Sequence, residues 1–174
     1  MKYCPTDRTQ LLFEVLNMAE SFVVSFFVDE CSDEEMNTYI GSRFIPYIYE
    51  LMQEHKNIVF LLPYGYASSE SVARTVRVIA ESHPEVRAQC WSVCSCSAEG
   101  LYEKMFGEKS NLFNRCVLLD NFDEVPLRQG RIVRNKKMVD MSDLSLFYIE
   151  KRNGRIYNTM KYAKETDKKY IRMK

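Results

Sequence analysis

The 174-residue sequence contains no long hydrophobic run and few of the residues that build common active sites. The longest strongly apolar stretch, Ser21 to Val28, is far too short to span a bilayer, which needs about 20 apolar residues. Met1 to Pro5 do not resemble the start of a signal peptide, so the sequence predicts a cytoplasmic protein without membrane contact. The six cysteines are then expected to be reduced thiols rather than a disulfide framework.

Motifs of the common enzyme classes are also missing. There are two histidines, His55 and His83, and no Gly-x-Ser-x-Gly motif, so a Ser-His-Asp triad is not expected. A P-loop and a GxGxxG fingerprint are both absent. Cys90, Cys94 and Cys96 follow a spacing that matches no common zinc site, and small thiols at alternating strand positions explain it better. The sequence therefore predicts no metal, no cofactor and no complete catalytic constellation.

Short apolar stretches alternate with amphipathic segments along the whole chain. This alternation predicts βαβ units and a mostly parallel sheet within a single domain, residues 1–174, whose first 21 residues form an added helix. Strands are expected over residues 22–28, 58–62, 86–93, 116–119, 144–149 and 170–173. Helices are expected over residues 6–20, 36–52 with a kink or a second start near Ser42, 69–82, 98–106, 125–141 and 156–164.

Asn153-Gly154 leaves two structures open for the end of the chain. Asn-Gly between apolar runs is a strong hairpin signal, so residues 144–151 and 155–162 could pair as antiparallel strands. Ile156, Met160 and Ala163 lie at helical spacing and favour a helix instead.

The net charge is zero, but the charges are unevenly distributed. Residues 1–127 contain 10 Lys/Arg against 19 Asp/Glu, or −9, and residues 128–174 contain 14 against 5, or +9. One interpretation is a basic surface for phosphates or nucleic acid. The other is that the two parts pack together and neutralise each other, with solvated lysines at the end of the chain.

The Pro63–Ser69 turn joins an expected strand to an expected helix. The free N–H groups and the dipole of a helix N-terminus favour an anion. Gly65 would let the backbone approach a ligand, and Ser68 and Ser69 could cap the helix or donate to phosphate. A capped turn without a ligand is equally compatible with these residues.

The segment from Arg134 to Asp143 combines polar and apolar residues on one helix. Asn135 shares a face with Ile132 and Val139, so we expect it to be at least partly buried and bonded to backbone groups of a neighbouring loop. Asn135 and Asp140 are predicted to form a structural polar network at the helix–strand corner. Arg134 and Asp143 could also reach the ligand pocket.

Two motifs in the last third of the chain carry a family resemblance. They are Arg134-Asn135-x-x-Met138-Val139-Asp140-x-Ser142-Asp143 and, after a hydrophobic strand, Gly154-x-x-x-Asn158-Thr159-x-x-Tyr162-Ala163. Together they resemble the SLOG (Smf/DprA–LOG) superfamily, and within it the YpsA-like branch. The resemblance implies a three-layer α/β sandwich, with a mostly parallel Rossmann-like sheet of five to six strands and helices on both faces, that binds a nucleotide or a nucleotide-derived ligand.

This chain departs from the family pattern in two places. The LOG signature PGGxGTxxE is absent, so the resemblance does not imply phosphoribohydrolase activity. Gly154-Arg155-Ile156 stands where the family usually has Gly-Gly-Thr, so bulky side chains occupy the turn that binds phosphate in relatives.

The sequence thus predicts a non-catalytic domain that binds a nucleotide-type small molecule. The predicted ligand-binding residues are Gly65, Ser68, Ser69, Arg134, Asp143, Gly154, Arg155 and Thr159, and Asn135 and Asp140 shape the pocket. One alternative is a nucleic-acid or protein interaction module that uses the basic C-terminal third. Another is a hydrolase of N-glycosidic or phosphate bonds with Asp143 or Glu70 as base, and self-association into a homo-oligomer is a further expectation.

Overall fold

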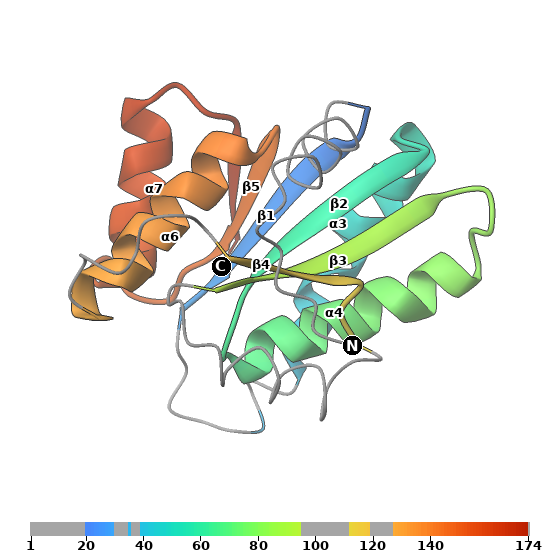
Figure 1. Cartoon of the computed structure of the whole chain (residues 1–174), viewed down its shortest axis with the longest axis horizontal. Helices are drawn as coiled ribbons and strands as arrows, with labels where there is room; N and C mark the ends of the chain where they lie inside the picture. Colours follow the sequence, from blue (N-terminus) through green and yellow to red (C-terminus); the bar gives the residue numbers. More distant parts are fainter. Residues whose placement is uncertain (1–19, 30–34, 36–38, 95–111, 119–126, 174) are drawn as a thin grey trace, which may run out of the picture.

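A parallel sheet forms the centre of the part of the chain that the computed structural model describes, residues 20–29, 35, 39–94, 112–118 and 127–173. Its six strands lie in the order β4-β3-β2-β1-β5-β6, and every neighbouring pair is parallel (Figure 1). The strands are β1 (Phe22–Val28), β2 (Asn57–Pro63), β3 (Arg87–Cys94), β4 (Arg115–Leu118), β5 (Leu144–Tyr148) and β6 (Tyr170–Met173). The predicted α/β class and parallel sheet are confirmed.

Among the residues that the structure describes, four helices cover the sheet and produce three layers. They are α3 (Gly41–Glu54), α4 (Ala67–Glu81), α6 (Leu127–Met141) and α7 (Arg155–Glu165). Two hydrophobic clusters show which helices pack together: one contains apolar residues of α3 and α4, and the other contains apolar residues of α6 and α7. Figure 1 shows α6 and α7 beside each other, away from α4. The three-layer Rossmann-like sandwich expected from the sequence is therefore the observed architecture.

Both faces of the central strand β1 are buried, which explains why its sequence is a continuous apolar run. Val24 and Phe26 pack in the α3/α4 cluster, whereas Val23 and Phe27 pack in the α6/α7 cluster. A strand covered by helices on both faces has no polar side, so alternation disappears from its sequence. Ser25 is the one polar residue of β1. Its burial is tolerated because its hydroxyl bonds to the Ser145 hydroxyl of β5, which is also buried, at 2.9 Å.

The segment after Asn153-Gly154 is the helix α7, not a hairpin. β6 lies parallel to β5, with Phe147 opposite Arg172. Parallel neighbours require a crossover connection, which a two-residue turn cannot provide. Ile156 and Ala163 are buried against the sheet, as their helical spacing predicts.

The remaining predictions have mixed outcomes. α3 begins at Gly41, so the expected second start near Ser42 is confirmed, and Pro46 lies inside this helix. The helices expected over 6–20 and 98–106, and the predicted start of α6 at 125–126, lie outside the described residues. None of the helices in the described ranges is long and apolar enough to cross a membrane.

Candidate functional site

The strand order places a topological switch point between β1 and β5. From β1 the chain continues to β2 on one side, and it later returns to place β5 on the other side. In open parallel sheets, ligands bind in the crevice outside the carboxyl ends of the strands at such a point. A cavity of about 240 Å³ opens at this place. It is lined by residues from the end of β1, from the turn between β2 and α4, and from the turn and first residues of the helix after β5: Val28, Asp29, Tyr66, Lys151, Asn153, Gly154, Arg155 and Ile156. We call this cavity the crevice.

The turn between β5 and α7 forms one wall of the crevice. Gly154 precedes the first residue of α7 and has φ +95°, a conformation that other residues rarely adopt. An added Cβ at Gly154 would meet nothing within 4 Å, so the conformation and not the space requires glycine. Arg155 and Lys151 bring positive charge to this wall. The backbone N–H of Lys151 also donates to Asp29 of the β1 end at 3.4 Å, which links the two strand ends.

The turn between β2 and α4 contributes a tyrosine rather than the predicted serines. Ser68 and Ser69 are buried, and the Ser69 hydroxyl donates to the carbonyl of Pro63 at 2.7 Å, so it fastens the helix start to the strand end. Gly65 has φ +86° with open space around it. It turns the chain so that Tyr66, the next residue, lines the crevice. We predicted that both serines could donate to a ligand. Neither lines the crevice, and the Ser69 hydroxyl donates to Pro63 instead.

A buried polar network joins α6, α7 and the β2–α4 turn. Arg134 on α6 is only 2% exposed, and its Nε and Nη2 both donate to Asn135 Oδ1 at 3.2 Å. Its Nη1 donates to the carbonyl of Tyr64 at 3.4 Å. Asn135 is fully buried and donates through Nδ2 to Thr159 Oγ1 of α7 at 3.4 Å. Burial of Asn135 confirms the prediction, but its partners are side chains and not the loop backbone groups that we expected.

Arg134 is a buried cation whose hydrogen-bond acceptors, Asn135 and Tyr64, are neutral. Its guanidinium carbon lies 5.5 Å from the ring centre of Tyr66, and that of Arg131 lies 5.9 Å from the same ring. Burial lowers the pKa of Arg134, and the neighbouring Tyr66 partly opposes this shift. Within the described ranges, Arg134 has no ion pair with a carboxylate. Because Tyr66 also lines the crevice, this positive charge lies next to a residue of the crevice wall.

Thr159 belongs to this network rather than to the crevice surface. It is 3% exposed, and its hydroxyl donates to the carbonyl of Arg155 at 3.0 Å while it accepts from Asn135. Thr159 therefore holds the first turn of α7 against α6. Its place behind the wall of the crevice makes it a supporting residue, not a lining one.

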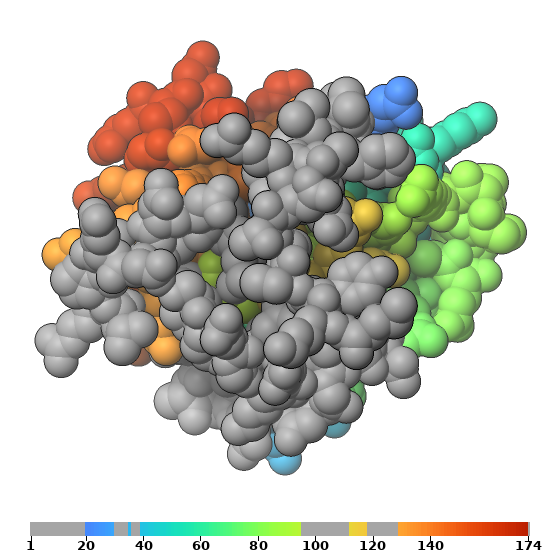
Figure 2. Space-filling model, in the orientation of Figure 1, coloured from blue at the N-terminus to red at the C-terminus, as the bar shows by residue number. Residues whose placement is uncertain are grey.

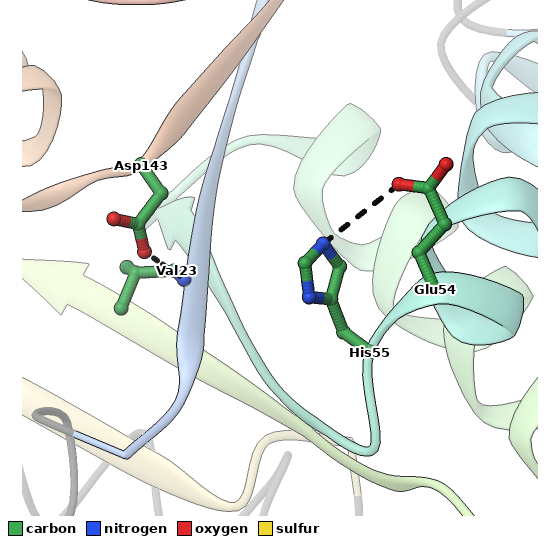
Figure 3. A network of polar contacts seen from close by, with 4 residues as sticks. All are labelled: Val23, Glu54, His55 and Asp143. Carbon is green, nitrogen blue, oxygen red and sulfur yellow. Dashed lines mark hydrogen bonds and ion pairs between the residues drawn. The ribbon is translucent and has the colours of Figure 1, made fainter.

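Asp143 lies at the opposite end of the sheet, so its predicted place in the pocket is wrong. Its Oδ2 accepts the backbone N–H of Val23 at 2.8 Å, at the first residues of β1 (Figure 3). At the same end, the ring of His55 stacks on Phe22 at 3.8 Å, with Glu54 at 3.9 Å from its Nε2. An aspartate that immediately precedes β5 must lie at the amino end of that strand, whereas the crevice lies at the carboxyl ends.

Asp140 bonds to residues other than the partners of Asn135, with which we predicted a shared polar network. Its carboxylate accepts from the Tyr162 hydroxyl of α7 at 2.8 Å, and its backbone carbonyl accepts from Lys168 at 2.8 Å. The Tyr162 bond joins the end of α6 to α7, and the Lys168 bond joins it to the segment that follows α7. The Asp140 carboxylate raises the pKa of Tyr162, chiefly through its hydrogen bond with the Tyr162 hydroxyl.

The structure brings part of the predicted site together. Gly154 and Arg155 line the crevice, Gly65 precedes the lining residue Tyr66, and Arg134 lies beside Tyr66. Sequence reasoning missed Val28, Asp29, Tyr66, Lys151, Asn153 and Ile156. Asp29 could have been found from its position, since it directly follows the end of β1. No group of three or more metal-binding side chains was found among the residues that the structure describes.

The chain is similar in fold to a solved DNA-processing protein. A structure of DNA processing protein A from Helicobacter pylori, presented for its unique single-stranded DNA binding mode, matches 99% of this chain and 74% of that chain with a TM-score of 0.59 and 12% sequence identity. At this identity the match shows a shared Rossmann-like fold. Searches against protein-family models and against curated proteins found no match.

Proposed function

We propose that the crevice binds one nucleotide unit of a small ligand, held mainly through its phosphate and sugar. The observation that carries the proposal is the position of the α7 N-terminus, which opens onto a cavity at the topological switch point. The free N–H groups and the dipole of a helix N-terminus favour an anion. Lys151 and Arg155 add two positive charges on the same wall, against the single carboxylate of Asp29.

The size of the crevice limits the ligand. Its volume of about 240 Å³ lies below the range of about 300–1,000 Å³ that is usual for sites that enclose a drug-sized molecule. A mononucleotide, or one unit of a larger ligand, therefore suits the crevice better than a whole dinucleotide does.

The buried positive charge of Arg134 also favours an anionic ligand in the crevice. A buried charge is costly when its partners are neutral, and an anion nearby reduces this cost. Arg134 is 2% exposed, and its guanidinium donates to the amide oxygen of Asn135 and the carbonyl of Tyr64. The guanidinium of Arg134 lies 5.5 Å from the ring centre of Tyr66, and Tyr66 lines the crevice, so a ligand phosphate beside Tyr66 would gain from the field of this cation.

A thermal-shift panel tests the proposal. AMP, ADP-ribose, NAD and nucleotide sugars are each added to the full chain, and a ligand at 100 times its Kd should stabilise the protein by ~2.7 kcal/mol. Arg155→Ala should weaken binding about ten- to a hundredfold, the loss of one charge-assisted hydrogen bond. Arg152→Ala is the matched control, because Arg152 lies in the same turn but is exposed and does not line the crevice. No shift with any compound at millimolar concentration would refute the proposal.

Single-stranded nucleic acid is a second candidate ligand, favoured by the surface of α6 and α7. Two exposed lysines lie over tyrosine rings there: Lys136 is 4.9 Å from the ring centre of Tyr162, and Lys161 is 5.2 Å from that of Tyr157. Basic side chains interleaved with aromatic rings suit a strand whose phosphates and bases both need partners. The similar fold of DNA processing protein A, presented for its binding of single-stranded DNA, agrees with this candidate.

Salt dependence separates this candidate from the first. For single strands, the logarithm of affinity falls with the logarithm of salt concentration with a slope of about −0.7 per phosphate contact. Replacing Lys136 and Lys161 with glutamate should therefore reduce the slope by about 1.4. Arg43→Glu and Arg74→Glu make the same charge change on the exposed surface of α3 and α4 and should leave the slope unchanged. Binding of an oligonucleotide that does not depend on salt would exclude this mode.

The hydrolase alternative receives no support from the described geometry. Asp143 lies at the amino ends of the strands, and Glu70, in the first turn of α4, does not line the crevice. Membership of the YpsA-like branch stays a prediction from the sequence motifs.

A further inference from the structure

Two cysteines from neighbouring strands meet at the carboxyl end of the sheet. Cys94 ends β3, and Cys116 is the second residue of β4, the edge strand. Their Sγ atoms are 3.3 Å apart. Because Ser92 lies opposite Cys116 and Leu118 lies opposite Cys94, the two cysteines are diagonal neighbours on the same face. A disulfide has a length of about 2.05 Å, so the sulfur atoms need to approach by about 1.3 Å.

The two thiols differ in ways that assign them different roles. Cys116 is half-buried, and the segment 112–118 that contains β4 reaches the surface in Figure 2. The hydrogen bond with Cys94 lowers the pKa of Cys116, although burial opposes this shift. A lower pKa gives more thiolate, which is the nucleophilic form. Cys94 is 3% exposed and lies against this sulfur, where it can attack an oxidised Cys116.

Cys90 provides an internal comparison. It lies on β3 four residues before Cys94 and is 4% exposed. Burial raises its pKa to about 12, so its thiolate is scarce at neutral pH. A cysteine of this kind acts as a small apolar core residue.

We propose that Cys94 and Cys116 form a redox-active pair that a hydroperoxide converts into a disulfide. The Cys116 thiolate attacks one peroxide oxygen, the O–O bond breaks, and Cys116 becomes a sulfenic acid while the departing hydroxide or alkoxide takes up a proton. The Cys94 thiol then attacks the sulfenic sulfur, so that the S–S bond forms, the S–O bond breaks, and water leaves with the Cys94 proton. The two thiols lose two electrons in total, and the hydroperoxide gains them.

Oxidation would act on an edge strand close to the crevice. β4 has four residues and, in the described ranges, pairs only with β3, so a covalent link to Cys94 fixes its position in the sheet. The neighbour of Cys94, Val93, accepts the backbone N–H of Tyr64 at 2.9 Å. The pair is thus one hydrogen bond away from the turn that positions Tyr66. This proposal stands independently of the ligand that the crevice binds.

Peptide mapping after oxidation tests the proposal. The reduced full chain is treated with hydrogen peroxide, remaining thiols are alkylated, and digested peptides are identified by mass spectrometry. The expected product is a peptide pair joined through Cys94 and Cys116, with the loss of two hydrogens. Cys96→Ser removes the nearest competing thiol in the sequence and should leave this product unchanged. A disulfide that joins other cysteines, or no disulfide, would overturn the proposal.

Single substitutions test the order of the two steps. Cys94→Ser should stop the reaction at a sulfenic acid on Cys116, which dimedone traps, and Cys116→Ser should abolish both the sulfenic acid and the disulfide. Cys90→Ser should change neither product. Circular dichroism before oxidation checks that each variant is folded, and the trapped adduct in Cys94→Ser keeps the test decisive if Cys116→Ser does not fold. Dimedone labelling of Cys90 at the same rate as Cys116 would contradict the assigned roles.

Discussion

Asn135→Leu tests the buried polar network that fixes α6 against α7. The substitution removes the oxygen that accepts two hydrogen bonds from the Arg134 guanidinium, and the amide that donates to Thr159. Arg134 is 2% exposed, so water does not easily replace the lost acceptor. Leaving buried charged donors without a partner costs about 3 kcal/mol, and the longer bond to Thr159 adds less. Burial of the leucine side chain returns about 1.5 kcal/mol or slightly more.

The net expectation is that the free energy of unfolding falls by about 1–3 kcal/mol. For a chain of this size, this loss corresponds to a decrease in Tm of about 2–12 °C. Urea unfolding followed by circular dichroism measures it, and an unchanged m-value would show that the change is in stability and not in the denatured state.

Asn135→Asp is the matched comparison. The carboxylate keeps the acceptor for Arg134 but cannot donate to Thr159, so it should destabilise less than leucine at neutral pH. The guanidinium should hold the pKa of this new carboxyl below its unfolded value. Its contribution is therefore present above the unfolded pKa and is lost as the pH falls through the folded pKa. If leucine costs less than aspartate at neutral pH, or costs nothing, Arg134 does not depend on this acceptor and the network has been misinterpreted.

Three further substitutions test the backbone conformation of Gly154, the space around Gly41 and the position of Asp143 in the sheet. Gly154→Ala should cost about 1–2 kcal/mol because φ +95° disfavours an L-residue, and thermal melting measures it even though the added Cβ has space. Gly41→Ala should cost about 1–3 kcal/mol for the opposite reason, since its Cβ would clash with Thr75 Oγ1 and the backbone carbonyl of Ser71. Asp143→Ala should lower stability by about 0.5–1.5 kcal/mol through the lost bond to the Val23 N–H. A change in nucleotide affinity on that last substitution would contradict its place at the far end of the sheet.

The elements of the fold were predictable because burial leaves a clear pattern in the sequence. Strands covered on both faces, such as β1 and β2, are continuous apolar runs, and α4 repeats its apolar residues at helical spacing. The segment after Asn153-Gly154 was ambiguous for a physical reason. A tight turn and a helix start both use a glycine, and only the parallel pairing of β6 with β5, a long-range fact, decides between them.

The site was less predictable, because its residues come together only through the order of the strands. Gly65 and Gly154 were found from their own turns, but Tyr66 lines the crevice because β2 lies beside β1, and Asp29 because β1 lies beside β5. No local pattern contains that order. The position of a polar residue in the sequence tells only at which end of its strand it lies. Asp143 precedes β5 and therefore lies at the amino end.

Position relative to the strand ends also explains why the residues of the two motifs in the last third of the chain have different roles. Arg134 and Asn135 come from the middle of α6, Thr159 from the first half of α7, and together they hold two helices and a turn in place. Gly154 and Arg155 are exposed to the crevice because they lie where β5 has ended and α7 begins. A ligand phosphate at that wall would meet the helix N-terminus and Arg155 directly, because both line the crevice and Arg134 does not. Arg155→Ala should therefore weaken binding while leaving stability nearly unchanged, whereas Asn135→Leu should lower stability whether or not a ligand is bound.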